Sequence, residues 1–469
     1  MKHTTQMIKS AKSAAAFFLL IFALASCAST KSQSASADND AFYSENAKDF
    51  YTETLENGIP VYFKKTNGKV AVVRMIIEGG TPLLPIEKSG LEDVTMRLML
   101  HGSKDWSYSQ IQQLEFETGF SLSSSASKDY SIIGFKCLIG DIDTVLAVFS
   151  DAIFNPLMNQ ADFDKIMMIC AEQVQREESD PSSQLTEVFH QAAYKNHAYA
   201  SSASVTKESL SNITLNDALE CKEKMLNAAR IKFVAVGNFD DAARASFLEQ
   251  LSSLFSSLTA QADWQPPKVE KITVAGEDIS VFNAQAGDSA YSIWWFNCPS
   301  RYDSDYIPFA LASMFLDDLL FSIVREQNGA VYSIGTGVLT GKEMLGAISA
   351  YKISDAENID ALIKQSLSSF PQKAEVKRQL DRYKNKYITT LFSNSGTTAQ
   401  TASSMITSLE YSGEIDTYLH RSSQVEAVNA DQVMLAYKHY FAPLLSSPAS
   451  YSKIIVSSKP SAASRQSED

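Results

Sequence analysis

Histidine is the side chain that most often binds catalytic zinc, and this sequence of 469 residues holds six of them. His190 and His197 are the pair with the shortest separation, seven residues. On one helix that separation spans roughly 10.5 Å along the axis, whereas the nitrogens on one zinc ion lie about 2.0–2.1 Å from it. We therefore expect ordinary surface or capping roles for these histidines.

Other patterns that would point to covalent or phosphate chemistry are missing from the sequence. It has no G-x-S-x-G motif, no phosphate-binding loop and no catalytic Cys–His signature. Four cysteines lie far apart, without C-x-x-C spacing: Cys137, Cys170, Cys221 and Cys298. Their apolar or helical surroundings predict buried free thiols, and the alternative is one disulfide in an oxidising compartment.

A fifth cysteine, Cys27, follows a segment typical of export. Three lysines and no acid precede a short apolar run, Ser13–Ala25, which is too short to span a bilayer. The run ends in Leu24-Ala-Ser-Cys27, which resembles the bacterial lipobox. We therefore interpret residues 1–27 as a lipoprotein signal peptide and Cys27 as the lipidated residue. The alternative is an ordinary secretory signal with an incidental cysteine.

The charge of the chain limits its partners. Its formal net charge is −13, and removal of the N-terminal lysines makes the mature chain more acidic. This negative charge excludes nucleic acid as a partner. It also disfavours binding to anionic lipid, so the acyl chains would have to attach the protein to the membrane. Residues 28–47 are rich in Ser, Ala and Asp and predict a flexible tether, and residues 459–469 predict a disordered tail. The remaining body is long enough for two domains.

The pattern of the body predicts alternating strands and helices. Asn57-Gly58 between apolar stretches indicates a hairpin, and Val70–Ile77 is a β-branched run. Helical periodicity follows over Gly90–His101, and Lys232–Gly237 is typical of a buried strand. Further helices are expected over Asp162–Glu178, Ser183–Ala193, Leu215–Leu226 and from Tyr306 to Glu326. Hairpins among helices favour an α+β fold over a doubly wound sheet.

The body also contains an internal repeat. Residues 261–274 predict a linker between an N-terminal domain, 48–260, and a C-terminal domain, 275–458, in which the strand pattern begins again. Both halves end in a capped helix followed by a strand. The expected N-caps are Thr214 and Asn429, each with an acid in the following turn that would complete a capping box. A repeat of this length indicates a duplicated domain.

Several landmarks together resemble the pitrilysin/insulinase family of inverzincin metallopeptidases, peptidase family M16. In chain order they are Thr54-Leu-Glu-Asn-Gly-Ile59, Gly90-Leu91, Gly102-Ser103, Asp180-Pro181, Ala193-Tyr194 with His197-Ala-Tyr199, and Arg325-Glu-Gln-Asn-Gly-Ala-Val-Tyr332. The resemblance covers residues 50–458. It implies two homologous domains, each a mostly antiparallel sheet faced by helices, which form one half of a clamshell.

The sequence departs from the family at the zinc motif. Aligning the segment between Gly90 and Gly102 without gaps places Asp93, Met96 and Arg97 where the family has His, Glu and His. Methionine cannot accept a proton, and arginine repels a dication. Asp93 and Arg97 are spaced for an i, i+4 ion pair in place of the metal, and the alternative is two solvated charges. Both interpretations leave the chain without zinc.

The family's third zinc ligand is a glutamate on a later helix. Counting back from Asp180-Pro181 places Gln173 at that position, and Glu172 is one residue away. The resemblance therefore implies a degenerate metal site and no cofactor bound by this chain.

Arg325 and Tyr332 match the pair with which the family's zinc-less half reaches the substrate. The resemblance implies a non-catalytic subunit of a heterodimeric peptidase, in which a partner subunit carries the zinc and both bind the peptide substrate. One alternative is a peptide-binding or scaffolding lipoprotein with no role in catalysis, and another is an active peptidase with a rewired site. From the residues alone, a structural Arg in an ion pair and a core Tyr are also open. We expect the protein to be exported and membrane-anchored, on the periplasmic or the cell-surface side.

Replacing Cys27 with Ser tests the anchor. If Cys27 is acylated, the variant should incorporate no labelled palmitate and should remain uncleaved or leave the membrane fraction. Palmitate labelling and fractionation of cells that express each form measure this. Membrane association that survives in Cys27→Ser would mean that another segment anchors the chain.

Overall fold

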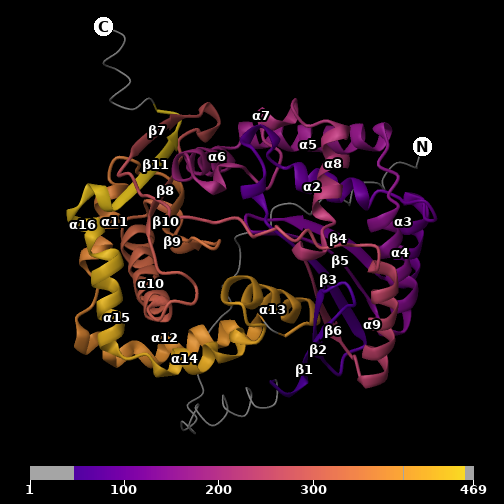
Figure 1. Cartoon of the computed structure of the whole chain (residues 1–469). Helices are drawn as coiled ribbons and strands as arrows, with labels where there is room; N and C mark the ends of the chain where they lie inside the picture. Colours follow the sequence, from indigo (N-terminus) through magenta and orange to yellow (C-terminus); the bar gives the residue numbers. More distant parts are fainter. Residues whose placement is uncertain (1–46, 395, 460–469) are drawn as a thin grey trace, which may run out of the picture.

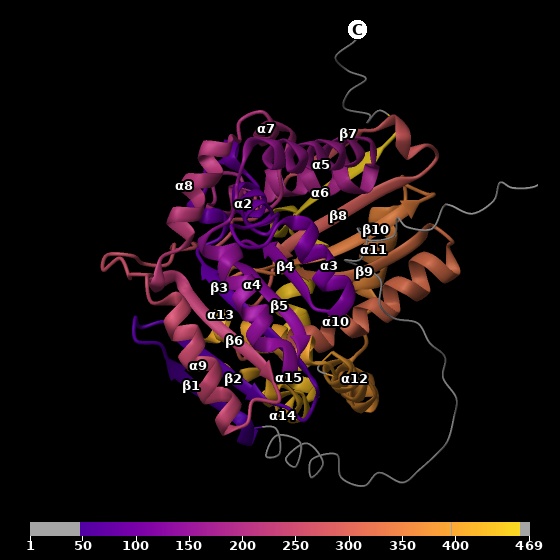
Figure 2. The same cartoon turned by 90° about the vertical axis from the view of Figure 1, so that its right-hand side faces the viewer.

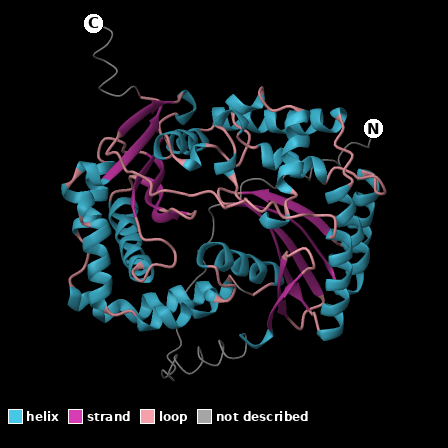
Figure 3. Ribbon diagram, viewed as in Figure 1, coloured by secondary structure: helices cyan, strands magenta, loops and turns pink. Residues whose placement is uncertain are grey.

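The computed structural model describes residues 47–394 and 396–459. Two β-sheets with helices on both faces make up this part of the chain (Figures 1 and 3). The predicted signal sequence with Cys27, nearly all of the tether and nearly all of the tail lie outside the described residues. Those three assignments stay predictions.

The first sheet has six strands. They are β1 (Phe50–Thr54), β2 (Pro60–Lys65), β3 (Val70–Glu78), β4 (Ser121–Ala126), β5 (Tyr130–Leu138) and β6 (Ile231–Gly237). Their order is β1-β2-β6-β3-β5-β4, and every neighbouring pair is antiparallel except β2 with β6. The predicted turn at Asn57-Gly58 joins β1 to β2, and Gly58 has a φ of +89°, which a residue with a Cβ rarely adopts.

The second sheet repeats this arrangement without a counterpart of β1. Its strands are β7 (Asp278–Phe282), β8 (Ala290–Asn297), β9 (Val331–Leu339), β10 (Leu345–Ile353) and β11 (Tyr451–Ser457). The order is β7-β11-β8-β10-β9, and its one parallel pair, β7 with β11, corresponds to β2 with β6 of the first sheet. The shared topology confirms the predicted α+β fold of two homologous, mostly antiparallel domains.

The helices between the strands follow the predicted periodicity, with boundaries shifted by a few residues. Those of the N-terminal half are α2 (Leu91–Met99), α3 (Tyr108–Thr118), α4 (Ile142–Phe154), α5 (Gln160–Ser179), α6 (Pro181–Ala193), α7 (Lys207–Leu210), α8 (Leu215–Met225) and α9 (Asp241–Phe255). Those of the C-terminal half are α10 (Tyr306–Leu320), α11 (Ile359–Ser368), α12 (Lys373–Ser393), α13 (Thr398–Ser412), α14 (Arg421–Ala427), α15 (Ala430–Ala436) and α16 (Pro443–Ser446).

Both predicted N-caps begin their helices. Thr214 accepts from the backbone of Asp217 and completes a capping box at the start of α8, as expected. Asn429 also completes a capping box, but its reciprocal partner is Gln432. The expectation of an acid there was wrong because the box requires the third residue after the cap, and Asp431 is the second.

Each sheet has two apolar faces, and each half of the chain covers one face of the other half's sheet. Helices α4 and α9 cover the first sheet on one side, as Figure 2 shows. Its other face, including Val72 and Val236, packs against Met405 and Leu409 of α13 from the C-terminal half. Each side chain that is fully buried in this way contributes roughly 1.5–3 kcal/mol.

The reciprocal contact uses α6 of the N-terminal half. Leu185 and Phe189 of this helix pack against Trp295 and Ile454 on the second sheet, and Ile272 of the predicted linker joins the same cluster (Figure 1). The remaining face of the second sheet is covered by helices of its own half, among them α10, α12 and α15. The chain therefore exchanges one helix in each direction between its two halves.

A buried carboxylate joins the two halves at the turn before β5. Asp129 is 2% exposed and accepts hydrogen bonds from the Tyr199 hydroxyl at 2.6 Å and from the Lys342 backbone N–H at 2.9 Å. The Tyr411 hydroxyl of α13 donates to it at 3.2 Å. Because a buried carboxylate is costly unless its oxygens are bonded, these contacts hold three distant segments together.

Within the described residues, one helix is long and apolar enough to cross a membrane, Tyr306–Gln327. Its mean hydropathy reaches 1.8, and 56% of the apolar window is buried inside the protein. Phe309 and Leu316 of this helix pack in the core of the second sheet. Burial of this kind is typical of a central helix in a globular domain, so length and composition are weak evidence for a span.

Replacing Tyr199 with Phe tests the junction at Asp129. The ring packing stays, but the carboxylate loses a donor and the Lys342 N–H loses an acceptor, so the free energy of unfolding should fall by about 1–3 kcal/mol. Urea and thermal unfolding measure the loss. Tyr108→Phe, at a ring that is 42% exposed, serves as the control. Equal stability of the two variants would show that the junction adds little.

Candidate functional site

Helix α2 carries the three residues that replace the expected zinc motif. Asp93 and Arg97 face the same side of the helix, and a carboxylate oxygen of Asp93 lies 2.8 Å from a guanidinium nitrogen of Arg97. Burial raises the pKa of Asp93, and the adjacent guanidinium opposes part of that rise. The structure thus shows the ion pair that the i, i+4 spacing predicts, since acid-before-base spacing suits helix geometry.

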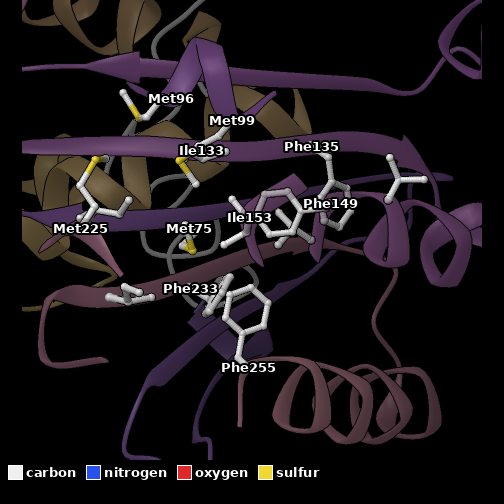
Figure 4. Packing of buried hydrophobic residues seen from close by; sticks show 14 of the residues in the cluster. Met75, Met96, Met99, Ile133, Phe135, Phe149, Ile153, Met225, Phe233 and Phe255 are labelled. Carbon is white, nitrogen blue, oxygen red and sulfur yellow. The ribbon is translucent and has the colours of Figure 1, made fainter. Parts of the chain in front are cut away.

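Met96, one turn after Asp93, points into the core of the first sheet. Its side chain is 0% exposed. Figure 4 shows it in the cluster of buried residues that contains Met75, Met99, Ile133 and Met225. A water molecule and a general base have no room in such packing, so this position contributes to stability and not to proton transfer.

The acid that α2 does bury is its neighbour, Glu92, which sequence reasoning missed. One carboxylate oxygen lies 3.1 Å from a guanidinium nitrogen of Arg230, and the other accepts from the Ser131 hydroxyl at 2.6 Å. Both charged side chains are at most 5% exposed. This ion pair holds α2 against the sheet. No local sequence pattern predicts it, because Arg230 is 138 residues away from Glu92.

Helix α5 carries the two candidates for the third ligand position. Gln173 is half-buried and donates to Glu177 at 2.9 Å, whereas Glu172 is exposed, 3.9 Å from Arg176. Cys170 of the same helix is buried and lies near Asp93 and Arg97, which both act on its pKa, although burial is the main cause that raises it. Helix α5 therefore does pack beside α2, but it presents a thiol, an amide and a solvated acid.

These residues do not fit the zinc ion that the fold family implies. A zinc site needs three or four nitrogen, sulfur or carboxylate donors aimed at one point. In the described ranges, no group of three or more His, Cys, Asp or Glu residues is placed to hold a metal. Asp93 is committed to Arg97, and Arg97 occupies a ligand position with a positive charge. No catalytic step can therefore be assigned to a metal on these residues.

His190 and His197, the closest histidines in sequence, lie on either side of Tyr194. Their ring centroids are 5.1 Å and 6.1 Å from the Tyr194 ring. Burial next to Lys128 lowers the pKa of His190 to about 4. His197 caps a turn, since its Nδ1 accepts from the Tyr199 backbone. His197 thus has the capping role that was expected, whereas His190 is half-buried against Tyr194, which is neither a surface nor a capping role.

The described cysteines are all free thiols: Cys137, Cys170, Cys221 and Cys298. The first three are buried, as the apolar surroundings predicted.

Arg325 lies at the C-terminal end of the long helix of the second domain. The helix continues from α10 into a π-helical turn, η8 (Phe321–Gln327). It ends at Gln327 with Asn328 as its C-cap, and the next residue, Gly329, has a φ of +60° that reverses the chain into β9. The position suits a cation because the carbonyl end of a helix is partly negative. The guanidinium carbon lies 5.1 Å from the ring centroid of Phe321.

The same turn brings Tyr332 next to Arg325. The guanidinium carbon lies 5.5 Å from the Tyr332 ring centroid, and the ring is 67% exposed. Thr336 of the same strand donates through its backbone and its hydroxyl to Asp317 of α10, at 2.5 Å and 2.8 Å, which fixes β9 against the helix. Both side chains reach solvent, and no ion pair involves Arg325 in the part of the chain that the structure describes. The alternative interpretation, in which Arg325 forms an ion pair and Tyr332 lies in the core, therefore does not fit this arrangement.

A second cation beside Tyr332 was not predicted. Lys352 has a φ of +52°, and its Nζ lies 5.7 Å from the Tyr332 ring centroid. It stands at a register shift between Ala350 and Ile353, where β10 has an extra residue relative to its partner strand. A bulge re-aims the side chain that it inserts. Nothing in the local sequence marks this bulge, because strand pairing defines it.

Two family models match adjacent parts of this chain. The model described as insulinase (peptidase family M16) matches residues 61–207, and the model described as peptidase M16 inactive domain matches residues 212–387. The chain belongs to peptidase family M16. Together with the altered motif on α2, this makes it an M16 protein of the zinc-less type.

Curated relatives of this M16 protein include subunits of larger assemblies. Mitochondrial-processing peptidase subunit alpha-1 of Dictyostelium discoideum is 26% identical over 202 residues, which are 42% of this chain and 30% of that protein. Cytochrome b-c1 complex subunit 1 of Caenorhabditis elegans is 20% identical over 407 residues, 82% of this chain and 84% of that one. An uncharacterized zinc protease of Rickettsia felis is 20% identical over 325 residues, 68% and 76% of the two chains.

Solved structures share the fold of this M16 protein. A Helicobacter pylori protease has a TM-score of 0.77 at 16% identity, with 88% of this chain and 99% of that chain covered. A peptidase M16 inactive domain from Pseudomonas fluorescens has a TM-score of 0.74 at 15% identity, with coverage of 88% and 98%. The periplasmic protease PqqL from Escherichia coli gives 0.73 at 15% identity, and this chain spans 46% of it.

Replacing Met96 with Glu puts the family's general base back into this M16 chain. Because the position is fully buried, the carboxylate should have a strongly raised pKa and lower the free energy of unfolding by about 3–4 kcal/mol at pH 7. The loss should grow as pH rises above about 4.3, since the unfolded chain then releases a proton that the folded chain retains. Urea unfolding as a function of pH measures both effects.

Met168→Glu is the matched control, because Met168 lies on α5 and is 63% exposed. It should leave stability nearly unchanged over the same pH range. A Met96→Glu variant as stable as this control would mean that the core beside α2 admits water.

Proposed function

We propose that this chain is the non-catalytic subunit of a heterodimeric zinc peptidase, in which Arg325 and Tyr332 hold the peptide at the zinc of a partner subunit. The observation that carries the proposal is the exposed pair at the helix–strand turn, in which the guanidinium carbon lies 5.5 Å from the ring centroid. Neither is needed to fill the core, since Tyr332 is 67% exposed. An exposed aromatic residue beside an exposed cation is better suited to binding a ligand than to stabilising the fold.

The chemistry of the pair suits peptide hydrolysis. A guanidinium and a phenol donate hydrogen bonds without supplying a metal ligand, and both can hold a peptide carbonyl. As water attacks that carbonyl, negative charge develops on its oxygen, and preorganised donors then stabilise the transition state. Lys352 adds a second positive charge on the other strand of the hairpin. The partner subunit would supply the metal-bound water.

Membership of family M16 and the names of two relatives support a heteromeric assembly. The relatives are called a processing-peptidase subunit and a cytochrome complex subunit. In our proposal the two domains form one half of a clamshell, and an M16-type subunit with an intact motif forms the other. The proposal also includes export and anchoring through Cys27, so that the complex acts at a membrane surface.

The competing function is a scaffolding or peptide-binding lipoprotein without a catalytic role. The altered zinc motif agrees with it equally well, because a scaffold needs no metal. The two functions differ in what they require of Arg325 and Tyr332, since only the first requires donors at the site of cleavage.

Replacing Arg325 with Ala, or Tyr332 with Phe, in the co-purified complex distinguishes the two functions. If the pair stabilises a developing oxyanion, each change should lower kcat by about 10²–10³, which corresponds to about 3–4 kcal/mol. Because both side chains are exposed, assembly and the thermal midpoint should stay the same. Turnover of a fluorogenic peptide per folded complex is the measurement.

Arg176→Ala and Tyr108→Phe, at exposed positions of the first domain, are the controls and should leave turnover unchanged. Unchanged turnover in both Arg325→Ala and Tyr332→Phe would leave the scaffold function. A lowered thermal midpoint with unchanged turnover would mean that the pair is structural.

A further inference from the structure

A cavity of about 460 Å³ lies inside the C-terminal half, away from Arg325 and Tyr332. Its walls come from the end of α12, from α13, from α14 and from the loop that follows β8. The volume is within the range of pockets that hold small organic ligands. Unlike the surface of this acidic protein, the wall of the cavity is positively charged.

Two arginines, Arg301 and Arg421, line the cavity, and the lining includes no Asp or Glu. Arg421 is 6% exposed, and its guanidinium donates to the Arg301 carbonyl at 2.6 Å. Among the described residues, no carboxylate lies within 4 Å of either guanidinium. Their close neighbours are aromatic rings: Arg421 lies 4.5 Å from the Tyr302 ring, and Arg301 lies 5.9 Å from the Tyr306 ring.

This charge arrangement is unusual for the chain. Its formal net charge is −13, yet these two cations share a partly enclosed space without an acid. Keeping a buried guanidinium without a counter-ion is costly, and an anion in the cavity would remove that cost. The planar fork of Arg301, which donates no hydrogen bond to a described residue, suits a carboxylate.

The facing wall is a stripe of hydroxyls on one side of α13. Ser403, Ser404, Thr407 and Ser408 lie one helical turn apart in pairs and line the cavity. The Ser403 hydroxyl donates to the Ala399 carbonyl, and the buried Ser408 hydroxyl accepts from Tyr302 and from the Tyr418 backbone. The Ser404 hydroxyl makes no hydrogen bond to a described residue and faces the cavity. The opposite side of α13 is the apolar face that covers the first sheet. The helix is thus buried on one side by the N-terminal half and offers hydrogen-bonding groups to the cavity on the other.

The rest of the wall is largely apolar. Leu391, Phe392 and Leu419 line the cavity next to the ring of Tyr387. Burial raises the pKa of Tyr387 to about 12, and both arginines act in the opposite direction. The phenol therefore stays protonated at neutral pH and is available as a donor beside the two cations.

We propose that this cavity binds a small organic carboxylate with an apolar body, such as the C-terminal residues of a short peptide. The Arg301 guanidinium would bind the carboxylate, the Ser404 hydroxyl of α13 would bond the neighbouring amide, and the apolar wall would take up the side chains. An inorganic anion would use the cations but leave the apolar and hydroxyl walls unused. This site is independent of the function proposed for Arg325 and Tyr332.

Calorimetric titration of the purified full chain with three probes tests the proposal. The tripeptide Ala-Leu-Phe with a free carboxylate should bind, and its C-terminal amide should bind at least tenfold more weakly. The third probe, 3-phenylpropionate, distinguishes the source of the carboxylate: if it binds and the tripeptide does not, the ligand is a non-peptide acid, still of the proposed class. Binding of inorganic phosphate alone, or equal binding of tripeptide and amide, would overturn the proposal.

Arg301→Gln should lower the affinity for the carboxylate at least tenfold and leave the thermal midpoint unchanged, since Arg301 donates no bond that holds the fold. Arg421 is unsuitable for this test because its guanidinium also bonds the Arg301 carbonyl and Gln424. Arg176→Gln on α5 is the matched control and should retain full affinity. Ser404→Phe, which fills the cavity from α13, should abolish binding independently of charge. Affinity that survives both Arg301→Gln and Ser404→Phe would place the ligand elsewhere.

Discussion

The covering of four apolar sheet faces is the constraint on which the rest of this structure depends. A strand such as β3 buries alternate residues on both sides, so Val73 packs with its own domain while Val72 requires another cover. Each half of the chain provides helices for one side of its sheet. The other side is covered by a helix from the opposite half, α13 in one direction and α6 in the other (Figure 1). Neither half could therefore exclude water from both faces of its sheet without the other half.

The polar contacts at this junction follow from the exchange. Once α13 lies on the first sheet, its Glu410 is nearly buried, and Lys232 of β6 lies 3.0 Å from it while also pairing with Glu78 at 2.5 Å. Asp129 joins the turn before β5 to Lys342 and to α13. Such groups add little net stability, but they are costly in any other alignment of the two halves. They fix one relative position of the domains, which places the Arg325 turn and the cavity behind α13.

The altered zinc motif shows how a catalytic helix becomes a structural one without a change of fold. The position of the family's general base holds the buried Met96, and the positions of the two histidines hold the partly buried Asp93–Arg97 ion pair. The helix is held by Glu92 and Arg230, neither of which belongs to the motif. The chain thus keeps the M16 architecture while the residues on α2 and α5 no longer form a donor set. In our proposal, the groups that act on the peptide lie in the second domain, on an exposed turn.

The sequence by itself determined the local features, because they depend on residues a few positions apart. Periodicity located the main helices and strands, Asn57-Gly58 specified its hairpin, and the i, i+4 spacing specified the Asp93–Arg97 pair. The restarting strand pattern and the shared ends of the two halves also indicated a duplicated domain, whereas the strand order within each sheet came from the structure. Only the tertiary structure decided which helix covers which sheet, where Lys352 lies relative to Tyr332, and that Arg301 and Arg421 share one cavity. Those features join segments from tens to hundreds of residues apart, and burial and strand pairing, which no local pattern encodes, bring them together.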